Sequence, residues 1–399
     1  MPYFERVQRQ LRELHPHLPL PPDAAIALSE QLTQRLQQQI AEHGPMPFQT
    51  FMQQILYAPG LGYYSAGLAK LGAAGDFITA PELSPLFSQC LAHCFAAPLQ
   101  QPNRSVLELG AGRGVMAAEM LRAWQSLDCL PSTYYILEVS ADLRAVQRAS
   151  IAQHVPELLS RVQWIDHWPQ QFCGVVVANE VLDAMPFCLF TVHGNRVMER
   201  AVTCEQNGQF KWAELPADTI LQQWFAHLPD EIRAAMHDGY QGEVLLSLPA
   251  WLQGLYQSID SAHVVLIDYG FPQHELYLAE RDQGTLMCHF RHHAHSDPLR
   301  LVGLQDVTCH VDFSAVADAA FDAGFSISGY SSQAGFLQSA GILNLAQSDD
   351  VATRFGYSQQ LKRLLLPSEM GELFKVICLS KNTTVDLPGF AINDRRHSL

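Results

Sequence analysis

Apolar and polar positions along the middle of the chain alternate between two periods. Short apolar runs bounded by turn residues are typical of buried strands, and apolar positions spaced three and four apart are typical of helices. From Arg104 this pattern predicts strands at "SVLELG", "TYYILEV", "RVQWI" and "GVVVANE", with helices over 113–124 and 141–152. Strands alternating with helices predict a parallel sheet covered by helices, with right-handed crossovers.

The regular alternation breaks after the fourth strand and later resumes. From Phe187 to about Gly242 the chain holds short alternating pieces, and "HGNR" between two of them predicts a β-hairpin. A strand at "HVVLIDYG", a helix and strand within "DFSAVADAAFDAGFSISGY", and a last strand at "GELFKVICLSK" follow. The intervening His-rich segment gives no clear period.

The N-terminal part predicts helices of its own. Helical spacing runs from Ala24 to a glycine stop at Gly44, continues in "PFQTFMQQILY", and starts again near Ser84-Pro85. We therefore expect an α/β core with an N-terminal helical cap and an inserted α+β region. The expected boundaries are 1–100 for the cap, 101–186 and 263–382 for the two halves of the core, 187–262 for the insertion and 383–399 for a tail.

Composition and charge narrow the class of protein. Of 399 residues 48% are hydrophobic and 16% charged, which indicates a well-buried globular enzyme rather than a disordered chain. The net charge of -15 argues against a nucleic-acid partner and favours a basic protein or a small molecule. Nine cysteines without a CxxC pair indicate free thiols, and the absence of a long apolar run argues against membrane insertion. We expect a cytoplasmic protein.

The stretch "VLELGAGRGVMAAEML" is a glycine-rich turn between a strand and a helix. A dinucleotide-binding GxGxxG turn needs a third glycine where Val115 stands. The spacing is GxGxG instead, preceded by Glu108. S-adenosylmethionine has no pyrophosphate and needs close backbone approach, which small residues permit. The candidate cofactor contacts are therefore Glu108, Gly110, Ala111, Gly112 and Gly114.

Acidic residues at the ends of the next two strands extend this candidate site. Glu138 ends "YYILEV", where a carboxylate can accept hydrogen bonds from both ribose hydroxyls, and Val139 follows it. A nicotinamide cofactor would use such an acid as well. Asp166 lies where an adenine amino group is commonly read, although a solvated loop acid explains it equally. Strand, glycine turn, helix and acid together favour S-adenosylmethionine, and a late strand after a helix–strand pair also suits the seven-stranded methyltransferase sheet with its antiparallel last strand.

The fourth strand runs into "ANEVLDAMPF", a second candidate site. Ligands of open α/β sheets lie beyond the carboxyl ends of the strands, which is where Asn179, Glu180 and Asp183 are expected. Two carboxylates suit a cationic methyl acceptor, because guanidinium makes bidentate charge-assisted hydrogen bonds. The alternative is structural: Asp183 caps a helix and Glu180 forms a salt bridge.

Two further polar segments carry weaker signals. In "GLQDVTCHVDF", His310 is a candidate general base or an ordinary hydrogen-bonding residue, and Asp312 suits a helix N-cap. "CHFRHHAH" would need helical spacing to bind zinc, and the Asp-Pro that follows favours a loop, so we expect no metal site. Cys90 and Cys94 share one face of an apolar helix and are predicted to lie in the core.

Taken together, the motifs "GYYS", "GDFITAPELSPLF", "LELGAGRGVMAAEML", "ANEVLDAMPF", "IDYG", "GLQDVTCHVDF" and "MGELFKV" make the chain resemble the MidA family of S-adenosylmethionine-dependent methyltransferases, from about Pro45 to Lys381. Mitochondrial members of that family assist the assembly of respiratory complex I. The resemblance implies a class I (Rossmann-like) fold and methylation of protein arginine. It also implies that Gly75, Asp76 and Thr79 contact the cofactor, in a segment that folds over it.

Other functions stay open at this point. The chain could be an assembly chaperone on a methyltransferase fold, with the insertion as its docking surface, or a small-molecule N- or O-methyltransferase. Strands expected in the insertion would also allow a homodimer.

Overall fold

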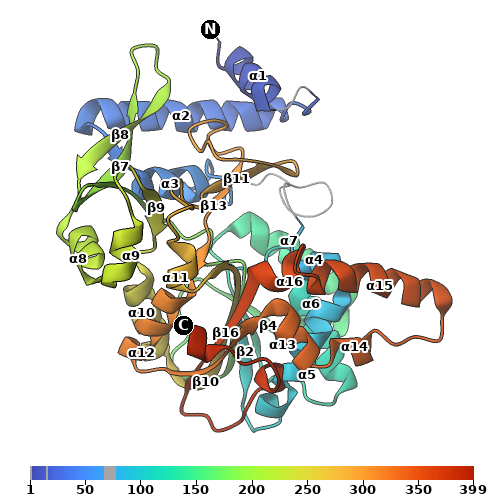
Figure 1. Cartoon of the computed structure of the whole chain (residues 1–399). Coiled ribbons are helices and arrows are strands. Elements are labelled where there is room, and N and C mark those ends of the chain that lie inside the picture. The colour runs from blue at the N-terminus through green and yellow to red at the C-terminus, as the bar shows by residue number, and fades with distance from the viewer. Residues whose placement is uncertain (1, 15–16, 67–77) are drawn as a thin grey trace. The chain divides into compact units, whose positions relative to one another are not determined.

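The computed structural model describes residues 2–14, 17–66 and 78–399 (Figure 1). The chain forms two compact units, and each is assembled from three separate segments. Unit 1 comprises residues 1–77, 184–247 and 274–310, and unit 2 comprises residues 78–183, 248–273 and 311–399.

Unit 2 is built on a mostly parallel sheet. Its strands are β2 (Ser105–Leu109), β3 (Tyr134–Leu137), β4 (Val162–Ile165), β5 (Phe172–Asn179), β10 (Ile259–Phe271), β14 (Val311–Asp312), β15 (Ser326–Ser332) and β16 (Phe374–Lys381). Their order is β15-β16-β10-β5-β2-β3-β4, with β14 pairing the end of β10. Neighbours from β10 to β4 run parallel, and β16 is antiparallel to both β10 and β15. The predicted class I sheet, seven strands with an antiparallel last strand, is confirmed.

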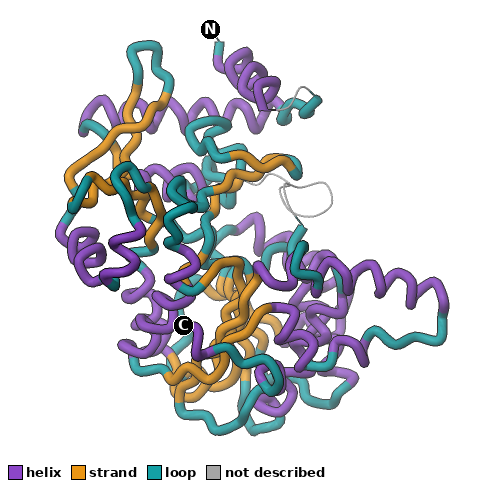
Figure 2. Tube along the Cα trace, viewed as in Figure 1, coloured by secondary structure: helices purple, strands orange, loops and turns teal. Residues whose placement is uncertain are grey.

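Helices cover both faces of this sheet. They are α4 (Ala80–Leu83), α5 (Pro85–Leu99), α6 (Val115–Ser126), α7 (Ala141–His154), α10 (Leu248–Ser258), α12 (Phe313–Ala323), α13 (Gln333–Ser339), α14 (Ile342–Leu345), α15 (Val351–Leu365) and α16 (Met370–Leu373), with 3-10 turns at Pro156–Arg161, Pro388–Phe390 and Arg396–Ser398. Helices α5, α6 and α13 lie on one side of the sheet, and α10 and α12 lie on the other (Figures 1 and 2).

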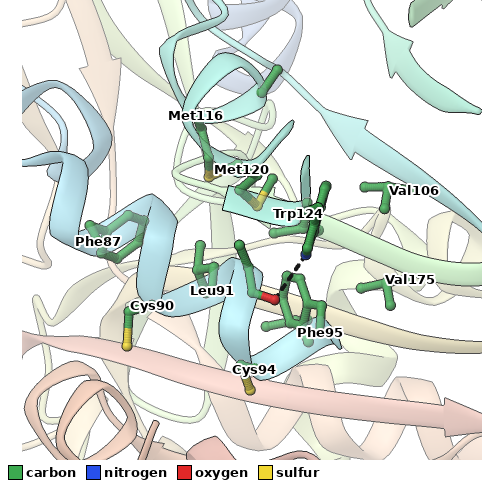
Figure 3. Close-up of a cluster of buried hydrophobic side chains, with 14 of the residues drawn as sticks. Phe87, Cys90, Leu91, Cys94, Phe95, Val106, Met116, Met120, Trp124 and Val175 are labelled. Atoms are coloured by element: carbon green, nitrogen blue, oxygen red, sulfur yellow. Dashed lines mark hydrogen bonds between the residues drawn. The ribbon is translucent and has the colours of Figure 1, made fainter. Parts of the chain in front are cut away.

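The core of unit 2 centres on α5, most of whose residues are buried among α6, α13 and the sheet (Figure 3). Cys90 and Cys94 are completely buried, as predicted. The indole N–H of Trp124 on α6 donates to the carbonyl oxygen of Ala92 at 2.8 Å, so this buried polar atom is paired. The helix starts where the sequence indicates, because the Ser84 hydroxyl accepts the N–H of Leu86.

Unit 1 contains two small sheets and its own helices. Its strands are β1 (Met46–Pro47), β6 (Cys188–His193), β7 (Arg196–Cys204), β8 (Phe210–Pro216), β9 (Gln241–Val244), β11 (Met287–Phe290), β12 (His293–His295) and β13 (Asp306–Thr308). Its helices are α1 (Tyr3–Leu14), α2 (Asp23–His43), α3 (Phe48–Tyr57), α8 (Thr219–His227), α9 (Asp230–Ala235) and α11 (Gln273–Leu276), the last starting at the final residue of a unit 2 segment. One sheet has the order β1-β7-β6-β9, and β8 also pairs with β7. The other sheet has the order β12-β11-β13.

The hairpins of unit 1 bear on two predictions, the turn at "HGNR" and the conformation of the His-rich segment. "HGNR" forms the predicted turn between β6 and β7, with Gly194 at a φ of 59°. The His-rich segment is a hairpin of β11 and β12 rather than a helix or a loop, so His289 and His293 lie on different strands. Within residues 2–14, 17–66 and 78–399, no three His, Cys, Asp or Glu side chains come together as metal ligands.

The two units divide the chain at other places than the expected boundaries. The first segment of unit 1 ends at residue 77, whereas the cap was expected to end at 100. The inserted segment covers 184–247 instead of 187–262, because α10 and the start of β10 belong to unit 2. Residues 274–310, expected in the second half of the core, return to unit 1. Residues 383–399 pack on unit 2, where the Arg395 N–H donates to the Tyr330 carbonyl oxygen. Across the part of the chain that the structure describes, every helix is too short or too polar to cross a membrane.

Candidate active site

The glycine turn after β2 takes a backbone conformation that only glycine adopts easily. Gly110, Gly112 and Gly114 have φ values of 62°, 52° and 79°. A Cβ at Gly110 would lie 3.0 Å from Cγ2 of Val181, and one at Gly114 would lie 3.2 Å from Cα of Gln147. The first glycine therefore lets the loop approach the turn after β5, and the third lets the start of α6 approach α7.

Beneath this loop, Glu108 on β2 is buried and bonded to the neighbouring strand. The Tyr134 hydroxyl on β3 donates to Glu108 Oε2 at 2.7 Å. Burial raises the pKa of Glu108 to about 7, and this hydrogen bond lowers it by a smaller amount. Glu108 thus fixes β2 to β3 below the glycine turn, and its predicted contact with a cofactor stays a prediction.

The carboxylate of Glu138 lies at the end of β3 and is held from two sides. The Ser140 N–H donates to Oε1 at 2.8 Å, and Gln147 Nε2 donates to Oε2 at 3.1 Å. Gln147 Nε2 also donates to the Gly112 carbonyl oxygen at 3.0 Å, which links the glycine turn to Glu138. Each carboxylate oxygen retains a further lone pair, so Glu138 can still accept hydrogen bonds from ribose hydroxyls.

Two residues near Glu138 line the same end of the sheet. Val139 is 76% exposed, an apolar side chain open to a planar ligand. Asp166 follows β4 and is exposed; its hydrogen bond with the His167 ring, at 2.6 Å, lowers its pKa. The predicted adenine contact of Asp166 stays a prediction.

Residues 179–183, which we call the acceptor turn, leave the end of β5. Glu180 has a φ of 54°, a left-handed conformation that costs energy for a residue with a side chain. Its N–H donates to the Ile267 carbonyl oxygen on β10 at 2.9 Å, and Asn179 Nδ2 donates to Glu180 Oε1 at 2.9 Å. Backbone and side chain of Glu180 are therefore both held.

A buried carboxylate on the adjacent strand anchors the acceptor turn. Asp268 on β10 accepts three successive N–H groups on Oδ2, from Val181 at 3.2 Å, Leu182 at 2.9 Å and Asp183 at 3.2 Å. Its Oδ1 accepts the Tyr269 N–H at 2.9 Å. Burial, and then the negative charge of Glu180, raise the pKa of Asp268, while the backbone N–H donors favour its ionised form and act in the opposite direction. Successive N–H groups around one oxygen form an anion nest, here filled by the protein itself.

The strand that carries Asp268 also orients the second carboxylate of the turn. The Tyr269 hydroxyl donates to Asp183 Oδ2 at 2.6 Å. The alternative that Asp183 caps a helix is wrong, because residues 181–183 form a turn and no helix begins there. The acceptor turn and the glycine turn thus meet at the carboxyl ends of neighbouring strands, β5 and β2.

Comparison with known proteins identifies the family of this site. The model of a family of S-adenosyl-L-methionine-dependent methyltransferases matches residues 89–331. The chain belongs to the MidA family of S-adenosylmethionine-dependent methyltransferases. A crystal structure from Burkholderia thailandensis, bound to S-adenosyl-homocysteine, is 41% identical, covers 96% of this chain and 100% of its own, and has a TM-score of 0.90.

Curated relatives of this MidA-family chain cover most of its length. The mitochondrial protein arginine methyltransferase NDUFAF7 of Danio rerio is 26% identical over 389 residues, 88% of this chain and 86% of the relative. The protein of the same name from Mus musculus is 28% identical over 394 residues, 88% of this chain and 86% of the relative.

The cofactor of the MidA-family chain is S-adenosylmethionine, and the residues present fit it. The glycine turn offers backbone without side chains, and the Glu138 carboxylate is oriented with lone pairs to spare. Of the contacts implied by the resemblance, Gly75 and Asp76 lie outside the described residues. Thr79 immediately precedes α4, and its role stays a prediction.

His310 does not belong to the unit that holds these groups. It is the last residue of a unit 1 segment, and its N–H donates to the Thr285 hydroxyl at 2.9 Å. Thr285 is in turn held by the buried carboxylate of Glu243, which accepts its N–H at 2.8 Å. The role of His310 as a general base stays a prediction. Asp312, by contrast, is the N-cap of α12, where its Oδ1 accepts the Ala315 N–H at 3.0 Å.

Sequence reasoning missed three residues that organise the site: Gln147, Asp268 and Tyr269. Gln147 lies mid-helix without any local signal. Asp268 and Tyr269 belong to "IDYG", an acid at the carboxyl end of a predicted strand next to the fourth strand. That position alone would have placed a carboxylate beside "ANEVLDAMPF".

Proposed function

We propose that this MidA-family chain is a protein arginine N-methyltransferase. The observation that carries the proposal is the acceptor turn: two carboxylates, Glu180 and Asp183, on a turn anchored by Asp268 next to the glycine turn. The names of the curated relatives support a protein arginine as the acceptor.

Bound S-adenosylmethionine supplies a methyl group made electrophilic by a sulfonium. Glu180 and Asp183 bind the guanidinium of the substrate through charge-assisted hydrogen bonds, which limit its rotation and present one nitrogen. Asn179 and Tyr269 hold the two carboxylates, so that the geometry exists before substrate arrives. The nitrogen that gains a methyl group must lose a proton, and a Glu180 carboxylate oxygen accepts it.

The test is transfer of a labelled methyl group from S-adenosylmethionine to proteins in a lysate of cells that lack this chain, followed by mass spectrometry. We expect label on arginine with the unaltered protein and at least a hundredfold less with Glu180→Gln or Asp183→Asn. Lys362→Gln, on the exposed side of α15, serves as the control and should keep full activity. Label on another residue type, or only on small molecules, would refute arginine as the acceptor.

An unchanged Glu180→Gln variant would point to a different conclusion. If label transfer occurred at the same rate without the carboxylate, the acceptor turn would not bind the substrate. If no label appeared in any protein or small molecule although S-adenosylmethionine bound, a non-catalytic assembly role would replace the enzyme.

A further inference from the structure

Unit 1 contains a cavity of about 390 Å³ between α1, α2, β8 and the loop over residues 297–302. Phe210, Trp212 and Leu299 contribute apolar surface to its wall. A volume of this size lies at the small end of the range for small-molecule sites, about 300–1,000 Å³.

Four cationic side chains line this cavity, together with only two acidic ones. The cations are Arg6, Arg9, Lys211 and Arg300, and the acids are Glu13 and Asp297. The chain as a whole has 40 acidic against 25 basic residues. A local excess of positive charge is therefore the reverse of the overall balance.

Two of the cations are already neutralised by the two acids. Arg300 donates to Glu13 at 2.9 Å and to Asp297 at 2.6 Å. Arg9 pairs with Glu13 at 3.7 Å. Both acids of the cavity are thus already paired with arginines, Arg9 on α1 and Arg300 in the 297–302 loop.

The other two cations have no such pairing. The Arg6 guanidinium lies over the Tyr3 ring, 4.6 Å from its centroid, and Lys211 is exposed on β8. Among the residues that the structure describes, neither Arg6 nor Lys211 has a carboxylate within 4.0 Å. An anion that enters the cavity would meet two cations whose charge is not yet matched.

The walls of the cavity are held in place by contacts of their own. The Tyr3 hydroxyl hydrogen-bonds Ser29 Oγ at 2.6 Å, and the Ser29 hydroxyl donates to the Val302 carbonyl oxygen at 2.5 Å. These bonds tie α1, α2 and the 297–302 loop together. Trp212 is fixed by the Arg200 guanidinium, 4.0 Å from its ring centroid. A ligand would therefore spend little free energy on ordering the site.

We propose that this cavity binds a small organic anion, a carboxylate or phosphate on an apolar frame, through Arg6 and Lys211. The apolar frame contacts the wall formed by Phe210, Trp212 and Leu299. The site lies within unit 1 and uses none of the residues that hold S-adenosylmethionine or the acceptor.

The test is calorimetric titration of the full chain with four probes, in the absence of S-adenosylmethionine. Phenyl phosphate and phenylacetate carry the anion and an apolar ring, inorganic phosphate carries the anion alone, and benzylamine carries the ring with a positive charge. We expect the first two to bind at least tenfold more tightly than inorganic phosphate, and benzylamine not to bind. The ratio of the dissociation constants of phenyl phosphate and phenylacetate tells whether phosphate or carboxylate is the preferred anion.

Variants assign the binding to this cavity. Lys211→Gln and Arg6→Gln are each expected to weaken phenyl phosphate about tenfold, the loss typical of one charge-assisted contact. Lys211 is exposed, so its replacement leaves the fold intact even if Arg6→Gln loosens α1. Lys362→Gln and Arg363→Gln, one lysine and one arginine exposed on α15, are the matched controls.

Three results would overturn the proposal: no binding of either aromatic anion, benzylamine bound as tightly as phenyl phosphate, or affinity unchanged in Lys211→Gln. Because the titration needs no methyl transfer, its outcome is independent of the proposed arginine methylation.

Discussion

The glycine turn and the acceptor turn follow adjacent parallel strands and reach the same edge of the sheet, but they are held in different ways. The glycine turn has three glycines at positive φ, and each position that needs a left-handed backbone has the residue suited to it. The acceptor turn places Glu180 at a φ of 54°, where glycine would be easier. Its conformation is imposed by Asp268, far away in sequence, which accepts three of its N–H groups.

The difference shows that local sequence determines the backbone of the glycine turn, whereas a residue on the neighbouring strand determines that of the acceptor turn. Under the proposed function a carboxylate at position 180 binds the substrate cation, so glycine could not replace it. The strain is offset by hydrogen bonds to a buried acid, as expected where function requires an unfavourable backbone.

The largest effect is expected at the contact between the two turns. Gly110→Val combines a φ of 62° with a side chain whose first atom already lies 3.0 Å from Val181. We expect at least a hundredfold loss of S-adenosylmethionine affinity by calorimetry and no measurable methyl transfer. Gly194→Val is the control, because it has a φ of 59° with no atom within 4 Å of its Cβ. Equal behaviour of the two variants would show that backbone strain alone, not the contact with Val181, explains the loss.

Asp268→Asn should disturb the acceptor turn and leave the glycine turn unchanged. Whichever way the amide is oriented, its Nδ2 faces backbone N–H donors, so the turn loses hydrogen bonds at a cost of about 2–4 kcal/mol in urea unfolding. Methyl transfer should fall at least a hundredfold, while S-adenosylmethionine affinity changes less than about threefold. A parallel loss of cofactor affinity would contradict the independence of the two turns. Asp218→Asn, at the exposed N-cap of α8 where only Oδ1 accepts an N–H group, is the control.

Glu108→Gln tests the acid below the glycine turn through its dependence on pH. The pKa of Glu108 is about 7 in the fold against 4.5 ordinarily, so the folded state holds this proton more tightly. The fold therefore loses stability as pH rises from about 4.5 to 7, and glutamine avoids this loss while still accepting from Tyr134. The free energy of unfolding of the variant, relative to the unaltered protein, should rise by about 2.5 kcal/mol between pH 5 and pH 8. A difference that is constant with pH would disprove the assignment.

The smallest effect concerns the strained residue itself. Glu180→Gly and Glu180→Ala both remove the carboxylate and should both abolish arginine methylation. Because only glycine adopts a φ of 54° without strain, the glycine variant should be more stable by about 1 kcal/mol in urea unfolding. Equal stability, or a more stable alanine variant, would show that the turn relaxes once the side chain is gone.

The sequence allowed the sheet of unit 2 and its glycine turn to be predicted, because buried strands and left-handed glycines leave local signals. The anchoring of the acceptor turn by Asp268 was not predicted, since only the pairing of β10 with β5 brings the two together. The hairpin of β11 and β12 was missed because its strands have only four and three residues. Helix α1 was missed although its apolar residues, at 3, 4, 7, 11 and 14, have helical spacing. The return of residues 274–310 to unit 1 depends on tertiary packing, which the periodicity of apolar positions does not report.

The place of β16 in the sheet has a consequence for how the protein is made. This strand is the last in the chain, yet it lies between β10 and β15, which are synthesised before it. Until residues 374–381 have left the ribosome, the nascent chain carries an unpaired, apolar edge on β10, and such edges recruit other chains. A premature stop before Phe374 would therefore yield an aggregating fragment rather than a shortened enzyme, and chaperones have most to protect before residues 374–381 emerge.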